Sequence, residues 1–276
     1  MTHSRTPRPV PLPFTAPTTP DLPSSGVAAR GQEAGAQAGA RPTVVLVHGA
    51  FADASSWNDT ITRLRRAGYP VVAPANPLRG LDYDAAYVRG RLQAVEGPKI
   101  VVGHSYGGAV ITNAAADSHE VRALVYVAAF IPEAEETLGA LMEQHPDSAI
   151  PPLPQQTFSY TLSDAATGTD VFLDPAQFRA SFAADVSEEK AALMAASQRP
   201  VSVAAFDQPT RRAAWKELPS WALIATEDQA IGAPLERFMA ERAGARISEV
   251  AGSHAVMVSN PDAVSRIIEQ ADLATR

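Results

Sequence analysis

The 276-residue sequence contains no cysteine, which excludes disulfide bonds, thiol catalysis and cysteine-ligated metal sites. It has no apolar run long enough to cross a bilayer. It also shows no N-terminal apolar segment followed by a small-residue cleavage site, as a secretory signal requires. We therefore expect a cytoplasmic protein. Basic residues are outnumbered, giving a net charge of −7, so nucleic acid and anionic membrane are not expected as partners.

The length and composition of the chain suit one globular domain with an inserted subdomain, since 46% of the residues are hydrophobic. Residues 1–42 differ from the rest because they hold eight prolines and a low-complexity Ala/Gly-rich stretch at 29–40. Such a segment buries too little apolar surface to fold. We expect a disordered tail over 1–42, either inert or a polyproline ligand, and a folded domain over 43–276.

From Thr43 onward, short apolar runs alternate with amphipathic segments. Strands are expected at 43–47, 69–74, 100–102, 121–130, 221–226 and 246–250, with helices at 56–67, 82–95, 108–116, 234–243 and 261–273. The continuous β-branched runs are typical of strands buried on both faces of a parallel sheet. This order predicts an α/β fold, with a doubly wound, mostly parallel sheet.

The alternation stops between residues 133 and 214. This part has no buried strand pattern but several short helical ones, including 174–184 and 187–196. We therefore expect an inserted helical cap over the carboxyl edge of the sheet.

One pentapeptide, Gly103-His104-Ser105-Tyr106-Gly107, lies between an expected strand and an expected helix. A strand, a sharp turn and a helix around G-x-S-x-G is the context of a nucleophile elbow, which holds a serine oxygen above the sheet. The residues two positions away must be small, and both are glycine. Ser105 is therefore the candidate nucleophile.

A serine hydroxyl needs a base, and the base needs an acid to orient it. In this architecture the chain order is nucleophile, acid, histidine. His254 follows the last strand and is the candidate base. Asp228, just beyond the strand at 221–226, is the candidate acid, with Glu227 and Asp207 as weaker alternatives.

The negative oxygen formed during acyl transfer needs two backbone donors. The candidates are the N–H groups of Tyr106, after the nucleophile, and of Ala50, after the first strand, where Gly49 allows close approach. No two histidines have the spacing of a metal site. Neither a metal nor another cofactor is expected.

Four segments together carry a family resemblance: Val45–Ala50, Gly103–Gly108, Thr226–Asp228 and Gly252–His254. They resemble the α/β-hydrolase superfamily, and more narrowly the branch of plant salicylate methyl esterases, hydroxynitrile lyases and bacterial relatives. The resemblance extends from about residue 41 to the C-terminus. It implies a sheet that starts at the first parallel strand, without the two strands that precede it in larger hydrolases.

Two positions separate the chemistries within that branch. Hydroxynitrile lyases carry threonine where this chain has Gly49, and lysine where it has Ala255. Both differences favour ester hydrolysis, so the resemblance implies a carboxylesterase. A lactonase, a lyase or perhydrolase, and a non-catalytic ligand-binding receptor are the alternatives on the same fold.

Of the parts of the site, the substrate pocket is the one that the sequence defines least. Phe51, Phe130 and Met257 lie next to the motifs and are candidate substrate contacts. Other aromatic residues could join them: Tyr106, Phe172, Phe178, Phe182 and Phe206. A small to medium apolar ester is expected, and the sequence leaves monomer and homodimer open.

Overall fold

The computed structural model describes residues 41–144 and 153–276. The expected tail over 1–42 lies outside the described residues, apart from its last two positions. Arg41 already belongs to the folded domain, because it forms an ion pair with Asp272 and its guanidinium lies 4.3 Å from the centre of the Tyr69 ring.

A six-stranded sheet forms the centre of the domain, in the order β2-β1-β3-β4-β8-β9, and all its pairings are parallel. The strands are β1 Thr43–Val47, β2 Val71–Val72, β3 Lys99–Ser105, β4 Val121–Ala129, β8 Ser220–Ala225 and β9 Arg246–Val250. The four inner strands are buried, which explains their continuous apolar sequences. The predicted α/β fold with a parallel sheet is confirmed.

Strand β2 is shorter than the 69–74 run predicts. Pro70 and Pro74 flank its two residues, and a proline has no N–H to donate to a neighbouring strand.

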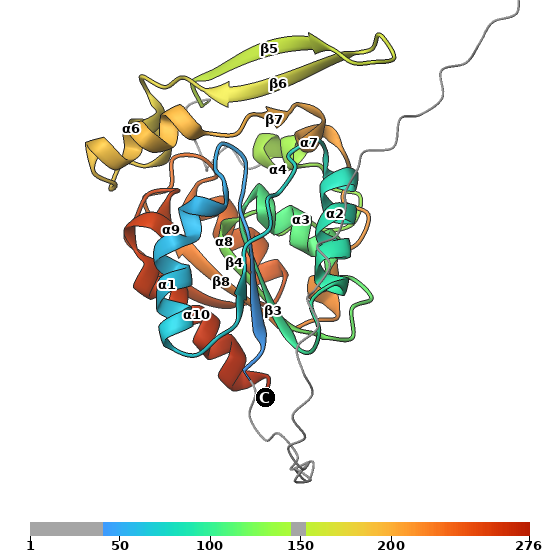
Figure 1. The fold of residues 1–276 in the computed structure, drawn as a ribbon, viewed down its shortest axis with the longest axis vertical. Helices are drawn as coiled ribbons and strands as arrows, with labels where there is room; N and C mark the ends of the chain where they lie inside the picture. Colours follow the sequence, from blue (N-terminus) through green and yellow to red (C-terminus); the bar gives the residue numbers. More distant parts are fainter. Residues whose placement is uncertain (1–40, 145–152) are drawn as a thin grey trace, which may run out of the picture. The chain divides into compact units, whose positions relative to one another are not determined.

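Helices cover both faces of the sheet (Figure 1). On one face α1 Asn58–Arg66, which follows the 3₁₀ turn η1 Ala54–Trp57, packs with α9 Val256–Ser259 and α10 Pro261–Ala274. On the other, α2 Leu81–Gln93 packs on α3 Tyr106–Ala114. The right-handed crossover rule puts α8 Ala233–Arg242 on the side of α3. No helix within 41–144 and 153–276 has the length and apolar character to cross a membrane.

The insertion between β4 and β8 lies over the carboxyl edge of the sheet (Figure 1). Its helices are α4 Leu138–Gln144, α5 Phe178–Phe182, α6 Glu188–Ser197 and α7 Ala204–Asp207, followed by the turn η3 Ala214–Lys216. Its strands, β5 Gln155–Thr161, β6 Thr167–Leu173 and β7 Val201–Ser202, form an antiparallel sheet.

The expectation of a helical cap is therefore corrected in part, because the insertion also contains strands. Strand β5 is almost entirely exposed, so its sequence alternates polar and aromatic residues and lacks the apolar run of a buried strand. Arg79 joins the small sheet to the loop after β2: its two terminal nitrogens lie 3.0 and 2.9 Å from the two carboxylate oxygens of Asp170.

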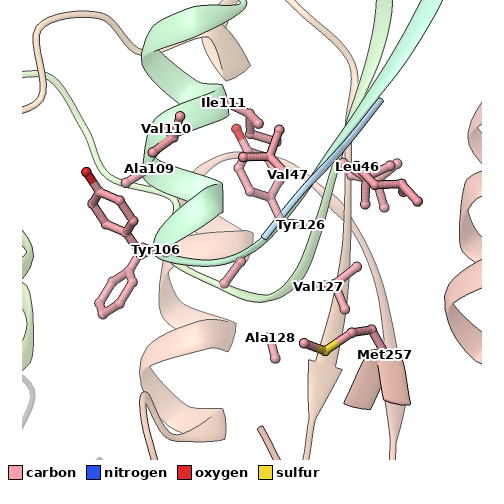
Figure 2. Close-up of a cluster of buried hydrophobic side chains, with 14 of the residues drawn as sticks. Leu46, Val47, Tyr106, Ala109, Val110, Ile111, Tyr126, Val127, Ala128 and Met257 are labelled. Carbon is pink, nitrogen blue, oxygen red and sulfur yellow. The ribbon is translucent and has the colours of Figure 1, made fainter. Parts of the chain in front are cut away.

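The core lies between the large sheet and its helices, and Figure 2 shows part of it. Every residue of α3 is buried, so the helix must approach the strands closely. Gly108 makes this possible, because a Cβ there would lie 2.3 Å from the Phe130 carbonyl oxygen just after β4.

We predict that Gly108→Ala lowers the free energy of unfolding by about 1–3 kcal/mol, because the added methyl group must push α3 away from β4. Gly90→Ala is the matched control: Gly90 lies in α2, and a Cβ there would meet no neighbouring atom within 4 Å, so it should stabilise by about 0.5–1 kcal/mol. Urea unfolding measures both. Equal effects of the two substitutions would contradict the close contact.

Candidate active site

Ser105 lies at the sharp turn between β3 and α3, with φ 53° and ψ −126°. This left-handed conformation costs a residue other than glycine about 1–3 kcal/mol, so surrounding structure must enforce it. The flanking glycines permit it. A Cβ at Gly103 would lie 2.6 Å from the Gly107 carbonyl oxygen, and one at Gly107 would lie 2.5 Å from that of Val47.

The structure brings Asp228 and His254 together. Asp228 lies in the turn after β8 and His254 in the loop after β9, and His254 Nδ1 is 2.5 Å from Asp228 Oδ2. The other oxygen, Oδ1, accepts the N–H groups of Ala230 and Ile231 at 2.5 and 3.0 Å. Both side chains are buried. Of the alternative acids, Glu227 is exposed and Asp207 lies in the cavity wall described below.

The pKa of Asp228 reflects this environment. Burial alone would raise it, but the adjacent His254 and the hydrogen bond from that ring outweigh burial and hold the pKa well below its usual range. Asp228 is therefore an ionised acceptor at neutral pH, which selects the His254 tautomer that carries its proton on Nδ1.

Ser105 and His254 line one cavity of about 270 Å³. With Nδ1 engaged by Asp228, Nε2 is the ring nitrogen left to serve this cavity. The remaining wall is mostly apolar and comes from both the sheet loops and the insertion: Ala50, Phe51, Tyr106, Phe130, Met142, Leu153, Gln155, Val171, Phe182, Val203, Phe206, Asp207, Ala230 and Ile231.

The two residues expected to supply backbone donors also lie at this cavity. Ala50 and Tyr106 line it, and the Ala50 N–H donates to no residue in the part of the chain that the structure describes. Tyr106 is the first residue of α3, so its N–H is outside the hydrogen bonds of the helix. A Cβ at Gly49 would lie 2.6 Å from Ser105 Cβ, so glycine lets the loop after β1 come this close.

His48 holds that loop in place. Its Nδ1 lies 2.9 Å from the Gly49 carbonyl oxygen, and its Nε2 lies 2.9 Å from the Asn76 backbone nitrogen. The Asn76 side chain donates back to the His48 carbonyl oxygen at 3.0 Å. Sequence reasoning missed this arrangement, because Asn76 lies in the loop after β2 and no local pattern marks it.

Two further contacts support the site. Tyr106 donates its hydroxyl to the buried Asp84 of α2 at 2.7 Å. His104 lies behind His254, with its Nε2 2.9 Å from the His254 carbonyl oxygen and the ring centres 4.7 Å apart. Burial, and then the nearby His254, lower the pKa of His104, so a neutral His104 donates this bond. Both residues sit next to Ser105 in sequence, and only their partners were unpredicted.

The three candidate substrate contacts have different outcomes. Phe51 and Phe130 line the cavity. Met257 does not: it is fully buried on α9, which packs against β4, and Figure 2 places it beside Val127 and Ala128. The expectation for Met257 is corrected, because the short helix after His254 turns this side chain into the core.

The aromatic residues of the insertion divide in the same way. Phe182 and Phe206 line the cavity, and the Phe182 ring centre is 4.8 Å from that of His254. Phe178 packs behind Phe182, and Phe172 packs on Phe158 in the small sheet. Over residues 41–144 and 153–276, no group of three or more histidine or acidic side chains is placed to hold a metal ion.

Comparison with known proteins identifies the family of this chain. The model of the alpha/beta hydrolase family matches residues 44–267. The chain is 37% identical over 121 residues to a carbendazim hydrolyzing esterase of Nocardioides sp. (strain SG-4G), a match that covers 39% of this chain and 48% of that protein. It is 26% identical over 253 residues to the alpha/beta hydrolase nvfD of Aspergillus novofumigatus, covering 84% of this chain and 96% of that one.

Among solved structures, polyneuridine aldehyde esterase shares the fold, with a TM-score of 0.73 and 20% identity over 83% of this chain and 98% of that one. The chain spans about half the length of the Nocardioides esterase it matches. The family match covers most of the chain, and the chain therefore belongs to the alpha/beta hydrolase family. The family predicted from the four motifs is confirmed.

We predict that His48 stays neutral in the folded protein well below pH 6. Burial lowers its pKa to about 4, against the opposing hydrogen bond to the Gly49 carbonyl. The pKa of an unfolded histidine is about 6.5. The contribution of neutral His48 to the free energy of unfolding is therefore complete above that pH and is lost as the pH falls toward 4, a change of about 3 kcal/mol in all. A ¹⁵N NMR titration of the ring measures it, and a midpoint near that of the urea-unfolded chain would contradict it.

Proposed function

We propose that this protein is a serine carboxylesterase in which Ser105 is the nucleophile, His254 the base and Asp228 the orienting acid. One observation carries the proposal: His254, paired with Asp228, lines the same apolar cavity as a serine held on a strained turn. This arrangement suits acyl transfer, because the strained turn presents the hydroxyl and the paired histidine can take its proton.

In the proposed reaction, Ser105 Oγ attacks the ester carbonyl carbon while His254 Nε2 takes the hydroxyl proton. The ionised Asp228 stabilises the imidazolium that forms. The carbonyl oxygen becomes negative and accepts the N–H groups of Ala50 and Tyr106. When the carbonyl re-forms, the bond to the alcohol oxygen breaks, and His254 returns the proton to the departing alcohol.

Hydrolysis of the acyl-enzyme repeats these steps with water as the nucleophile. His254 takes a proton from water, the hydroxide oxygen bonds to the acyl carbon, and the proton then returns to Ser105 as the acid leaves. No other group has to supply or store a proton.

The cavity supports a small or medium apolar ester as the substrate. A space of about 270 Å³ with aromatic and aliphatic walls favours a compact acyl or alcohol group. Among the described residues that line it, none is lysine or arginine, so no basic side chain in this part of the wall attracts an anionic substrate or a departing anion. Gly49 and Ala255 fit this interpretation, since the lyase branch carries threonine and lysine there. A cyclic ester would use the same groups.

We expect Ser105→Ala to lower kcat for p-nitrophenyl butyrate by at least about 10³-fold without loss of folding, because the variant keeps every other group but has no nucleophile. Ser197→Ala is the matched control, since Ser197 is exposed at the end of α6, and it should retain the wild-type rate.

A series of p-nitrophenyl esters from acetate to decanoate then measures the length of acyl chain that the cavity accepts. The size of the space predicts an optimum at butyrate or hexanoate and a decline before decanoate. Retained activity in Ser105→Ala would refute the assigned nucleophile. If the wild type hydrolyses no ester, a lactone panel decides between cyclic substrates and a non-catalytic role.

A further inference from the structure

A second carboxyl group lies beside the Asp228–His254 pair. Glu236 is in the first turn of α8, and only 2% of its surface is exposed. Its Oε2 accepts the backbone N–H of Ala225, the last residue of β8, at 3.3 Å. The side chain therefore extends from the helix to the strand end that carries the Asp228 turn.

The Glu236 carboxyl group lies close enough to that of Asp228 for the two to interact directly. The backbone of Ala225 contacts both residues, because its N–H donates to Glu236 Oε2 and its carbonyl oxygen accepts the Asp228 N–H at 3.1 Å. Two adjacent buried carboxylates repel each other when both are ionised, so one of the two groups holds a proton. The remaining question is which carboxyl group holds it.

The surroundings of the two groups differ sharply. Asp228 accepts two backbone N–H groups and the His254 ring, all of which favour the ionised form. Glu236 has only the longer bond from Ala225, and its Oε1 receives no nitrogen or hydroxyl donor from the residues that the structure describes. The adjacent charge gives the same answer: burial, and then the Asp228 carboxylate, raise the pKa of Glu236 well above its ordinary range.

Arg237, the next residue, offsets this only in part: its charge lowers the pKa of Glu236, but the side chain lies toward solvent and pairs with Glu249 of β9 at 2.8 Å. The titratable groups next to Glu236 are therefore Asp228 and Arg237. His254 lies beyond Asp228, with His104 against the far side of the His254 ring.

We propose that Glu236 is a positioning residue: it remains a neutral carboxylic acid and donates its O–H to Asp228, fixing the carboxylate that orients His254. This inference rests on the proposed esterase function. With it, Asp228 has a donor for each of its four contacts, two backbone N–H groups, one ring N–H and one carboxylic O–H. The unpartnered Glu236 Oε1 also acquires a role as the oxygen that carries the proton.

Such a donor has a definite effect on His254. It disperses part of the negative charge of Asp228, so the carboxylate stabilises the imidazolium less and rotates less freely. Removing the donor should therefore make His254 a stronger base but a less well-oriented one.

Two substitutions separate a neutral Glu236 from an ionised one. Glu236→Gln keeps a neutral side chain that donates an N–H to Asp228 and accepts from Ala225. It should keep kcat/KM for p-nitrophenyl butyrate within about threefold, with the acid limb of the pH profile unchanged. Glu236→Leu removes the donor at similar volume. It should lower kcat about 10- to 100-fold with little change in KM, and move the acid limb to higher pH.

An ionised Glu236 would give a different pattern. Glu236→Gln would then delete a negative charge close to His254 and move the acid limb to lower pH by about one pH unit or more. That outcome, or a Glu236→Leu enzyme with wild-type kcat and pH profile, would overturn the proposal. A role in folding alone would lower the unfolding midpoint without moving the pH profile.

A third measurement does not depend on activity. An unfolded glutamate is ionised above about pH 4.3, whereas the folded wild type is proposed to keep the proton. The wild type should therefore become less stable relative to Glu236→Gln as the pH rises. The ratio of its unfolding constant to that of the variant should increase tenfold for each pH unit between pH 5 and 8. A pH-independent ratio would refute a protonated Glu236. If this ratio changes as expected while no ester is hydrolysed, the proton assignment stands and the esterase proposal fails.

Discussion

The left-handed turn at Ser105 is the constraint on which the rest of the structure depends. It is tolerated only because three backbone segments approach it without side chains between them, at Gly49, Gly103 and Gly107. Gly108 extends the same principle by letting α3 press on the end of β4. The end of β3, the start of α3 and the loop after β1 therefore meet at Ser105, and the rigid core around them fixes the position of its hydroxyl group.

Burial and hydrogen bonding set the charge states of the titratable groups around Ser105. His48 and His104 are kept neutral by burial, and Asp228 is kept ionised by the donors that converge on it. If Glu236 is neutral, the four groups His48, His104, Glu236 and Asp228 together carry one negative charge in the resting state, next to the His254 ring that is proposed to gain a proton. The attraction between Asp228 and a protonated His254 is then not divided among competing charges.

Much of this could be predicted from the sequence where the signal is local. The bounds of β1 and β9 match the expected runs, and Ser105, Asp228 and His254 stand at strand ends that the apolar runs define. The features that the sequence did not predict depend on contacts between distant segments. Strand β5 is exposed and carries no apolar run; Asn76 and Glu236 act through partners on other loops; and Met257 is next to the site in sequence but turned into the core.

The insertion between β4 and β8 supplies much of the cavity wall, including Phe182, Phe206 and Leu153, whereas Ser105, Asp228 and His254 come from loops of the central sheet. The two parts of the site are therefore encoded in separate stretches of the gene. Changes confined to residues 133–214 can reshape what fits the cavity without altering the three residues proposed to react. On the proposed function, a lineage with this layout can acquire new substrates by altering one segment, while the reaction itself is inherited unchanged.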